Sequence, residues 1–398
     1  MILPIATMDI HTLRQHTRGL EDGKIFLNNA GSSLMPDIVV DAVTGYLKLE
    51  EQVGGYEAAR INTALLEEFY KETAKLVNAK PSNIAFATSA TEAYAKALSS
   101  IDFTEGDVII TTADDYISNQ ITFLSLQKKL GVKIIRMKNL PDLELDLENL
   151  ERLIKQYHPR LVAVTHIPTS SGLIQNVEAV GKICREHHIL YLVDACQSVG
   201  QMVVDVEKIG CSFMTATGRK FMRGPRGTGF LYVSDEVLEK DYAPLLLDMR
   251  GADWTESDNY ELYGTAKRFE HWEISFASLL GFTEAVKYAN RIGMPFIEAY
   301  NRHLSGQLRD QLEAGGFNVW DWGNQLSSIV TFSRPDGNLD KIQKVLKDHQ
   351  VSFSVTYKNS ALIDFTRKNI DGIVRLSPHY FNTPEEIEQV TGILKNSF

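Results

Sequence analysis

Two charged residues in the middle of the chain each follow a short apolar segment rich in β-branched residues. Asp194 ends the run 189–194, and Lys220 comes just after the run 212–216. A Gly/Pro-rich turn over 224–229 then leads into a third strand-like run. A lysine can form a Schiff base with pyridoxal phosphate, and an aspartate can hold that cofactor's ring nitrogen protonated. The pattern therefore predicts a pyridoxal phosphate site.

Each of these two residues also has a simpler explanation. Lys220 could be a surface lysine, and Asp194 could cap the end of a strand. Lys220 lies between a strand whose apolar composition predicts burial and a glycine-rich turn, and this position favours the catalytic role. A carboxylate directly after Ile-Leu-Tyr-Leu-Val needs a partner that offsets its desolvation, and a pyridinium supplies one.

A phosphate-bearing cofactor needs backbone N–H groups at the start of a helix, together with hydroxyls and a cation. Ser89 opens a capping box, which places Ala90 and Thr91 at a helix N-terminus. Thr217 and Arg219, just before the lysine, supply a hydroxyl and a guanidinium. These residues are candidate phosphate ligands. A nucleotide site is disfavoured, because neither G-x-x-x-x-G-K-[S/T] nor G-x-G-x-x-G is present.

The middle of the chain alternates between short apolar strands and helices. Strands are expected at 84–87, 108–110, 132–135, 161–164, 189–194, 212–216 and 229–233. This spacing predicts an α/β fold with a mostly parallel sheet covered by helices. Ligands collect at the carboxyl ends of the strands in such sheets. The residues that follow expected strand ends are Thr88, Asp115, Thr169, Asp194 and Lys220.

The pattern also predicts how the chain is divided. Residues 1–20 are expected to form an N-terminal arm with a short helix, residues 21–290 a large cofactor-binding domain, and residues 291–398 a smaller α+β domain. Long helices are expected over 56–78 and 273–291, with an irregular segment over 248–271 between them. The small domain should contain strands at 317–319, 328–332, 351–355 and 373–376, and a last helix with a capping box at 383–386.

Composition excludes several classes of function. The formal net charge is −10, which gives no basic footprint for nucleic acid. Apolar runs are too short to span a bilayer, and the N-terminus lacks the features of a signal peptide. The three cysteines, an odd number without a CxxC pair, argue against a disulfide framework. We expect a soluble cytoplasmic protein with no nucleic-acid, membrane or metal partner.

The order and spacing of these motifs resemble the class V aminotransferase family of pyridoxal phosphate enzymes, fold type I, which includes cysteine desulfurases. The matching motifs are DxxQ from Asp194, T-G-R-K ending at Lys220, and G-P-x-G-x-G-F-L-Y from Gly224. The resemblance extends from the turn at 28–31 to the last helix. It implies a seven-stranded type of sheet in the large domain, and a homodimer with its active site at the subunit interface.

The resemblance also implies roles for individual residues. Gln197 would donate to the phenolic oxygen of the ring, and Thr169 takes the position of a family asparagine. Tyr116 would stack on the ring where relatives carry a histidine, but it does not titrate near neutral pH, so an acid–base role there is in doubt. Arg219 replaces a histidine that most relatives have. Ser275 would contact the phosphate bound in the other subunit.

The substrate is expected to be an α-amino acid. Arg375 matches the family arginine that forks the substrate carboxylate, although a plain salt-bridging arginine is the alternative. The substrate pocket should include Ala30 and Gly31, which lie in a polar turn able to present N–H groups, and Tyr56.

The expected catalytic residues are Lys220, Asp194 and Arg375. The substrate amine displaces Lys220, which then removes the α-proton while the ring, protonated through Asp194, delocalises the carbanion. His-Ile-Pro-Thr-x-x-Gly, Arg-Phe-Glu-x-Trp-Glu and Ser-Pro-His-Tyr look most like the branch of isopenicillin N epimerase-like proteins and ergothioneine C–S lyases. We therefore favour β-elimination from a cysteine-derived substrate, giving pyruvate and ammonia. Transamination and epimerisation are alternatives, because the same carbanion serves all three.

One absence separates this chain from persulfide-forming desulfurases. Those enzymes need a thiolate on a mobile loop in the C-terminal third. The cysteines here are Cys184, Cys196 and Cys211, and the corresponding loop, 356–362, has none. A cysteine desulfurase is therefore less favoured. A non-catalytic protein of this fold could lose the substrate arginine, but Arg375 is present, so this alternative is disfavoured. A Rossmann-type nucleotide enzyme is disfavoured because its glycine fingerprint is missing.

Overall fold

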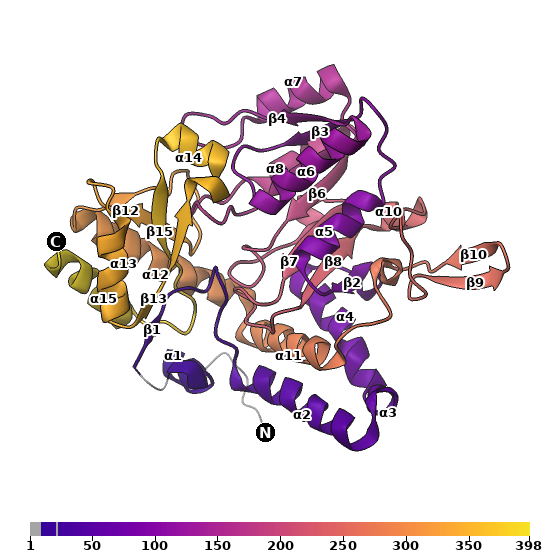
Figure 1. Cartoon of the computed structure of the whole chain (residues 1–398), viewed down its shortest axis with the longest axis horizontal. Coiled ribbons are helices and arrows are strands. Elements are labelled where there is room, and N and C mark those ends of the chain that lie inside the picture. Colours follow the sequence, from indigo (N-terminus) through magenta and orange to yellow (C-terminus); the bar gives the residue numbers. More distant parts are fainter. Residues whose placement is uncertain (1–8, 21–22) are drawn as a thin grey trace.

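A seven-stranded sheet forms the centre of the computed structural model, which describes residues 9–20 and 23–398 (Figure 1). Its strand order is β2-β8-β7-β6-β5-β3-β4. The strands are β2 (Ile84–Ala87), β3 (Val108–Thr111), β4 (Lys133–Arg136), β5 (Leu161–Thr165), β6 (Leu190–Asp194), β7 (Phe213–Thr217) and β8 (Gly229–Val233). Within this sheet β8 runs in the opposite direction to the other six strands. The expected α/β fold with a mostly parallel sheet is confirmed.

Helices cover both faces of this sheet, which explains why its inner strands are mostly apolar. Alternate residues of β5 enter opposite cores: Val162 and Val164 join one cluster, whereas Leu161 and Ala163 join the other. The first face carries α4 (Thr63–Val77), α7 (Leu147–Tyr157), α8 (Val177–Glu186) and α11 (Phe276–Ile292). The second face carries α5 (Ala90–Ser99), α6 (Ile117–Leu130) and α10 (Asp235–Glu239). The short helix α9 (Val206–Ile209) lies between β6 and β7 in the chain.

The C-terminal part of the chain builds a second, antiparallel sheet with the order β11-β12-β15-β14. Its strands are β11 (Asn318–Val319), β12 (Val330–Ser333), β14 (Ser354–Tyr357) and β15 (Gly372–Leu376). The helices α12 (Met294–Ala314), α13 (Leu339–Asp348) and α15 (Pro384–Asn396) share one core with it. Thr383 and Glu386 form the expected capping box. The exact domain boundaries stay a prediction.

The N-terminal segment connects the two sheets. Helix α1 (Ile10–Gln15) begins after Asp9, whose carboxylate caps it, while residues 1–8 of the expected arm lie outside the described residues. Strand β1 (Ile25–Phe26) pairs in parallel with β13 (Val351–Ser352), and Asn28 then bridges to Ser377. Helix α2 (Asp37–Val53) packs against α11. The polar turn after β1 is therefore held between the end of β15 and the central sheet.

Four elements differ from the expectation. The helix expected over 56–78 is broken into α3 (Gly55–Ile61) and α4, because the Asn62 side chain donates to the Ala58 carbonyl and ends the first helix. The strand expected over 351–355 is divided between β13 and β14, which belong to different sheets. Helix α14 (Leu362–Lys368), which begins at the last residue of the expected loop 356–362, was not predicted. A hairpin of β9 (Ala252–Glu256) and β10 (Asn259–Leu262) occupies the segment expected to be irregular, and its mostly exposed side chains left no alternating pattern to read.

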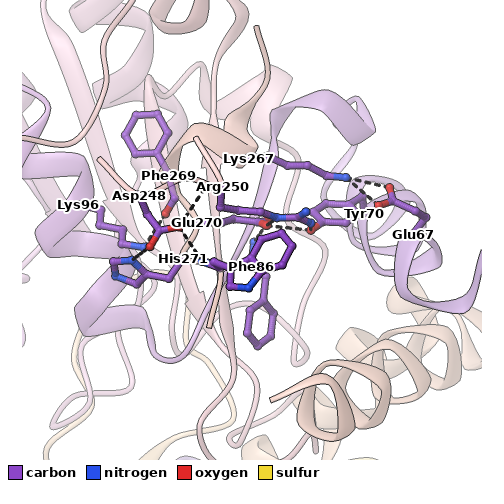
Figure 2. A network of polar contacts seen from close by, with 11 residues as sticks. Glu67, Tyr70, Phe86, Lys96, Asp248, Arg250, Lys267, Phe269, Glu270 and His271 are labelled. Carbon is purple, nitrogen blue, oxygen red and sulfur yellow. Dashed lines mark hydrogen bonds and ion pairs between the residues drawn. The ribbon is translucent and has the colours of Figure 1, made fainter. Parts of the chain in front are cut away.

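A buried polar network fastens the segment after this hairpin to the central sheet (Figure 2). The Glu270 carboxylate accepts from the Phe86 backbone N–H at 2.8 Å, the Tyr70 hydroxyl at 3.0 Å and Arg250 Nε at 3.2 Å. Lys267 lies 4.1 Å from the centroid of the Tyr70 ring. The network therefore fixes the segment that leads into α11.

Among the described residues, no helix is both long and apolar enough to cross a membrane.

Candidate functional site

A cavity lies at the carboxyl ends of the central parallel strands. Loops that follow β5, β6 and β7 reach it because parallel strands end at the same edge of a sheet. Its lining consists of Ser89, Ala90, Thr91, Tyr116, Thr165, Ile167, Thr169, Asp194, Cys196, Gln197, Thr217, Arg219 and Lys220. All the expected cofactor residues except Ser275 are therefore brought together within one chain.

Lys220 lines this cavity and is buried, which is unusual for a lysine. Its side chain emerges from the loop after β7, and its Nζ lies 5.8 Å from the centroid of the Tyr116 ring. Burial lowers its pKa from the ordinary lysine value, and neighbouring Cys196 and Asp194 act in the opposite direction. The amine is therefore neutral over a wider pH range than that of an exposed lysine.

Glycines let helix α5 approach the loop that carries the lysine. A Cβ atom on Gly229 would lie 2.6 Å from the Ala216 carbonyl oxygen and 3.1 Å from the Ala90 nitrogen. The Gly218 and Gly224 backbones close the lysine loop, because the Gly224 N–H donates to the Gly218 carbonyl at 2.8 Å. The N-terminus of α5, with Ala90 first, thus lies beside this loop.

Asp194 ends β6 and is 4% exposed. Its Oδ1 accepts from the Cys196 backbone N–H at 3.0 Å, and its Oδ2 accepts from Asn119 Nδ2, also at 3.0 Å. Asn119 lies in the first turn of α6 and was not identified from the sequence. No sequence signal pointed to it, because Asp115 lies before the extended N-cap Tyr116 and the two side chains meet through the turn into the helix.

Arg375, Thr169 and Gln197 form one hydrogen-bonded group. Arg375 Nη1 donates to the hydroxyl and the carbonyl oxygen of Thr169, and Gln197 Nε2 donates to the same hydroxyl at 2.9 Å and to the Ala30 carbonyl at 3.1 Å. Within the described part of the chain, neither Arg375 Nε nor Gln197 Oε1 has a hydrogen-bond partner. Burial, aided by the charge of Arg219, lowers the pKa of Arg375 to about 10. A buried guanidinium of this kind is suited to an anionic ligand.

The polar turn after β1 lies beside this cavity, because it is hydrogen-bonded to the lining residues Arg219 and Gln197. Arg219 Nη1 donates to the Gly31 carbonyl, and the Ser33 N–H donates to the Arg219 carbonyl at 2.8 Å. The Asn29 side chain donates to the Ser377 carbonyl at 2.8 Å. Ala30 and Gly31 are therefore fixed next to the lysine loop, but through their carbonyl oxygens rather than through N–H groups aimed at a ligand.

Five expected site residues are absent from the lining of this cavity. Arg375, Ala30 and Gly31 lie next to it through their hydrogen bonds to Thr169, Gln197 and Arg219. The other two are Tyr56 and Ser275. Tyr56 lies in α3 with 82% of its surface exposed, and Ser275 caps α11 by accepting from the Ser278 N–H at 3.2 Å. Tyr56 instead lines a separate groove together with Trp272 and Phe276. Within one chain, both residues are therefore remote from Lys220.

The three cysteines are poorly suited to act as thiolates. Cys184 and Cys211 are buried, and burial raises the pKa of each thiol to about 12. Cys196 lines the cavity, where burial and the charge of Asp194 raise its pKa well above the usual range. His166 is also buried, which lowers its pKa to about 4 and keeps it neutral, as a packing residue would be.

These features together fit a phosphorylated pyridine aldehyde. A buried lysine amine and a buried carboxylate face one cavity, the N-terminus of α5 and Arg219 supply donors for a phosphate, and Gln197 Oε1 and Arg375 Nε have unused hydrogen-bonding capacity. Across residues 9–20 and 23–398, no group of three or more His, Cys, Asp or Glu side chains is arranged to hold a metal ion.

Comparisons with known proteins agree with this geometry. A family model described as Aminotransferase class-V matches residues 25–390. A probable cysteine desulfurase of Pyrococcus abyssi is 31% identical over 93% of each chain, and one of Methanothermobacter thermautotrophicus is 29% identical over 96% of this chain and 94% of that one. The apo structure of the cysteine desulfurase of Thermococcus onnurineus NA1 has a TM-score of 0.90 and 28% identity, over 98% of both chains.

Proposed function

Because this chain belongs to the aminotransferase class V family and is a pyridoxal phosphate-dependent enzyme, we propose that it breaks the C–S bond of a cysteine-class amino acid. The names of the relatives support a substrate that carries sulfur on its β-carbon. The proposed product set is pyruvate, ammonia and a sulfur-containing fragment. The absence of a cysteine in the segment 356–362 is the observation that favours this outcome.

The residues around the cavity have distinct proposed roles toward the cofactor. Lys220 would anchor its aldehyde carbon, Asp194 would hold the proton on its ring nitrogen, and Tyr116 would stack on its ring. Gln197 and Thr169 would hydrogen-bond its phenolic oxygen. Ala90, Thr91, Thr217 and Arg219 would hold its phosphate. When bound, pyridoxal phosphate supplies an electron sink for the negative charge that develops at the substrate α-carbon.

The substrate is handled by Arg375 and Lys220. The Arg375 guanidinium binds the substrate carboxylate, which fixes the α-carbon against the lysine amine. Burial lowers the pKa of Lys220, which favours the neutral amine that is needed to accept the α-proton. The electron pair of the broken C–H bond then forms the Cα–Cβ double bond as the C–S bond breaks and the sulfur leaves with its electrons. Addition of one water to the released enamine gives pyruvate and ammonia.

Cysteine desulfuration is the second candidate, because the relatives have that name. It would move the sulfur atom to a thiol of the enzyme and release alanine. The raised pKa of all three thiols disfavours this transfer, since the thiolate is the nucleophile.

One product assay separates these reactions. The purified holoenzyme is incubated with L-cysteine, L-cystine and S-methyl-L-cysteine, first without a keto acid, and pyruvate and alanine are quantified. Pyruvate in equimolar amount with ammonia supports elimination. Alanine with a protein persulfide shows desulfuration, and amination of an added keto acid without pyruvate release shows transamination. Either of these two results contradicts the proposal.

We further propose that the active form is a homodimer in which Ser275 and Tyr56 reach the cavity of the partner copy. Support comes from large exposed side chains around the groove that contains Tyr56, including Tyr56 itself and Trp272. The test mixes inactive Lys220→Ala chains with inactive Ser275→Trp chains. Partial recovery of activity is expected, since one of the two sites in a mixed dimer is intact. A monomeric active enzyme would contradict this arrangement.

A further inference from the structure

A chain of hydrogen-bonded polar side chains extends from Asp194 to the edge strand β4. Asn119 Nδ2 lies 3.0 Å from Asp194 Oδ2 and 3.1 Å from Asp115 Oδ1. An amide nitrogen carries two hydrogens, so it can donate one to each carboxylate. Asn119 is 5% exposed, and the reversed amide would place its oxygen against two carboxylates. Asn119 therefore bridges the two acids.

Asp115 holds Asn119 in this orientation. The Asp115 carboxylate also accepts from Gln120 Nε2 at 2.8 Å, from the Thr111 hydroxyl at 3.2 Å and from the Thr165 hydroxyl. Because these donors occupy its oxygens, the carboxylate cannot rotate without breaking several hydrogen bonds. Its Oδ1 accepts from the Tyr116 backbone N–H at 2.6 Å and from Asn119 Nδ2 at 3.1 Å.

Gln120 links this group to a cation on the edge strand of the sheet. Its Oε1 accepts from Arg136 Nε at 3.1 Å and from Nη2 at 2.7 Å, while its Nε2 donates to Asp115. The guanidinium of Arg136 fixes which end of the Gln120 amide faces the acid. Two amides, each with a determined orientation, thus connect Arg136 to Asp194 through Asp115.

We propose that Asn119 is a positioning residue that stabilises the ionised form of Asp194 and thereby keeps the cofactor's ring nitrogen protonated. This inference rests on the proposed pairing of Asp194 with that nitrogen. A donor to a carboxylate favours the ion over the neutral acid. Without Asn119, Asp194 keeps one donor of two and becomes more basic. The proton shared by the pair then moves toward the carboxylate, and the ring becomes a weaker electron sink.

The test uses the holoenzyme loaded with ring-¹⁵N-labelled pyridoxal phosphate, whose nitrogen chemical shift reports ring protonation by NMR. Asn119→Leu is compared with wild type across pH, and we expect its nitrogen shift to lie closer to that of an unprotonated ring at every pH at which the wild-type ring is protonated. The turnover number kcat should fall about 10- to 100-fold, the effect of one hydrogen bond to a charged group. KM should change little, because Arg375 still binds the substrate. Asn119→Ala serves as a second variant if the leucine variant does not fold.

The matched control is Asn149→Leu, which removes another buried amide, on α7, away from the cavity. This variant should have the same nitrogen chemical shift and the same kcat as wild type. A wild-type nitrogen titration in Asn119→Leu, or in Asn119→Ala if only that variant folds, would overturn the inference. Asp194→Asn tests the premise separately: if its ring stays protonated, the proposed role of Asp194 fails. If Asp194→Asn loses ring protonation and the Asn119 variants do not, only the inference about Asn119 fails.

Discussion

Arg375 Nη1 donates to both oxygens of Thr169, the side-chain hydroxyl at 2.6 Å and the main-chain carbonyl at 2.9 Å. This pair joins the end of β15 to the loop after β5, two segments that are 206 residues apart in the chain. The guanidinium is therefore held against Thr169, which lines the cavity, in an orientation set by the central sheet. Its Nε is still available to a ligand, because no described residue pairs with it.

Thr169→Val should weaken substrate binding, because valine has the shape of threonine but cannot accept from Arg375. We expect KM for a cysteine-class substrate to rise about 10-fold, the effect of one lost hydrogen bond to a charged group, with a smaller change in kcat. Arg375→Lys should cost more, since lysine lacks the planar fork that matches a carboxylate. Steady-state kinetics of both variants provides the measurement. Equal KM values in Thr169→Val and wild type would contradict the proposed positioning.

Lys220→Ala should abolish turnover while the fold persists. Loss of the base alone is expected to lower kcat by about 10²- to 10⁴-fold. Loss of the anchoring amine should also change the visible absorbance of the bound cofactor and allow its removal by dialysis. Lys344→Ala, on the exposed face of α13, is the matched control and should match wild type in both assays. A Lys220→Ala protein with the absorbance and rate of wild type would exclude the assigned role.

The native thiols should react slowly with alkylating reagents. Burial raises the pKa of Cys184 and Cys211 to about 12, and that of Cys196 also lies above its usual range, so little thiolate exists at pH 8. Mass spectrometry after iodoacetamide treatment should show an essentially unmodified native protein and three modified cysteines after denaturation. Rapid labelling of Cys196 in the native enzyme would instead indicate a reactive thiol in the cavity and favour the desulfurase alternative.

His166 should make the protein less stable in acid. Its pKa is about 4 in the folded protein because of burial, whereas the unfolded chain takes up the proton near pH 6.5. Between these values only the unfolded state is protonated at this residue, so its contribution lowers stability as pH falls. The slope is about 1.4 kcal/mol per pH unit at most. Urea unfolding from pH 6.5 to 4.5 should be less pH-dependent in His166→Gln, whereas His303→Gln, at an exposed position, should behave as wild type.

Glu270→Ala should destabilise the fold strongly. The substitution leaves the Phe86 N–H and the Tyr70 hydroxyl without an acceptor inside the protein and removes the partner of Arg250 (Figure 2). We expect a loss of about 3 kcal/mol in the free energy of unfolding, within the range for breaking a buried charged network. Glu236→Ala removes an exposed ion pair with Lys240 and should cost less than about 0.5 kcal/mol. Chemical denaturation of both variants gives the comparison.

The strand–helix alternation and the motif around Lys220 could be read from local patterns. The inner strands of the central sheet are short apolar runs because they are buried on both faces, and such runs can be recognised in the sequence. The edge strand β4 is only partly buried and begins and ends with a charged residue. The elements that were predicted wrongly depend on contacts between residues that are distant in the chain, and no local pattern contains such contacts. The division of 351–355 between β13 and β14 depends on pairing with β1 and with β15, strands that are distant in the chain.

The sequence by itself determined the cofactor class, because an acid and a lysine after two parallel strands must meet at one edge of a sheet. It also determined the inventory of thiols, since a missing cysteine needs no coordinates. Only the tertiary structure decided how these residues are held. The bridge from Asn119 to Asp194 and the pair formed by Arg375 and Thr169 join residues that are 75 and 206 positions apart, and such contacts arise from the packing of whole elements. Local propensity acts over a few residues, so it does not predict contacts between residues that are far apart in the chain.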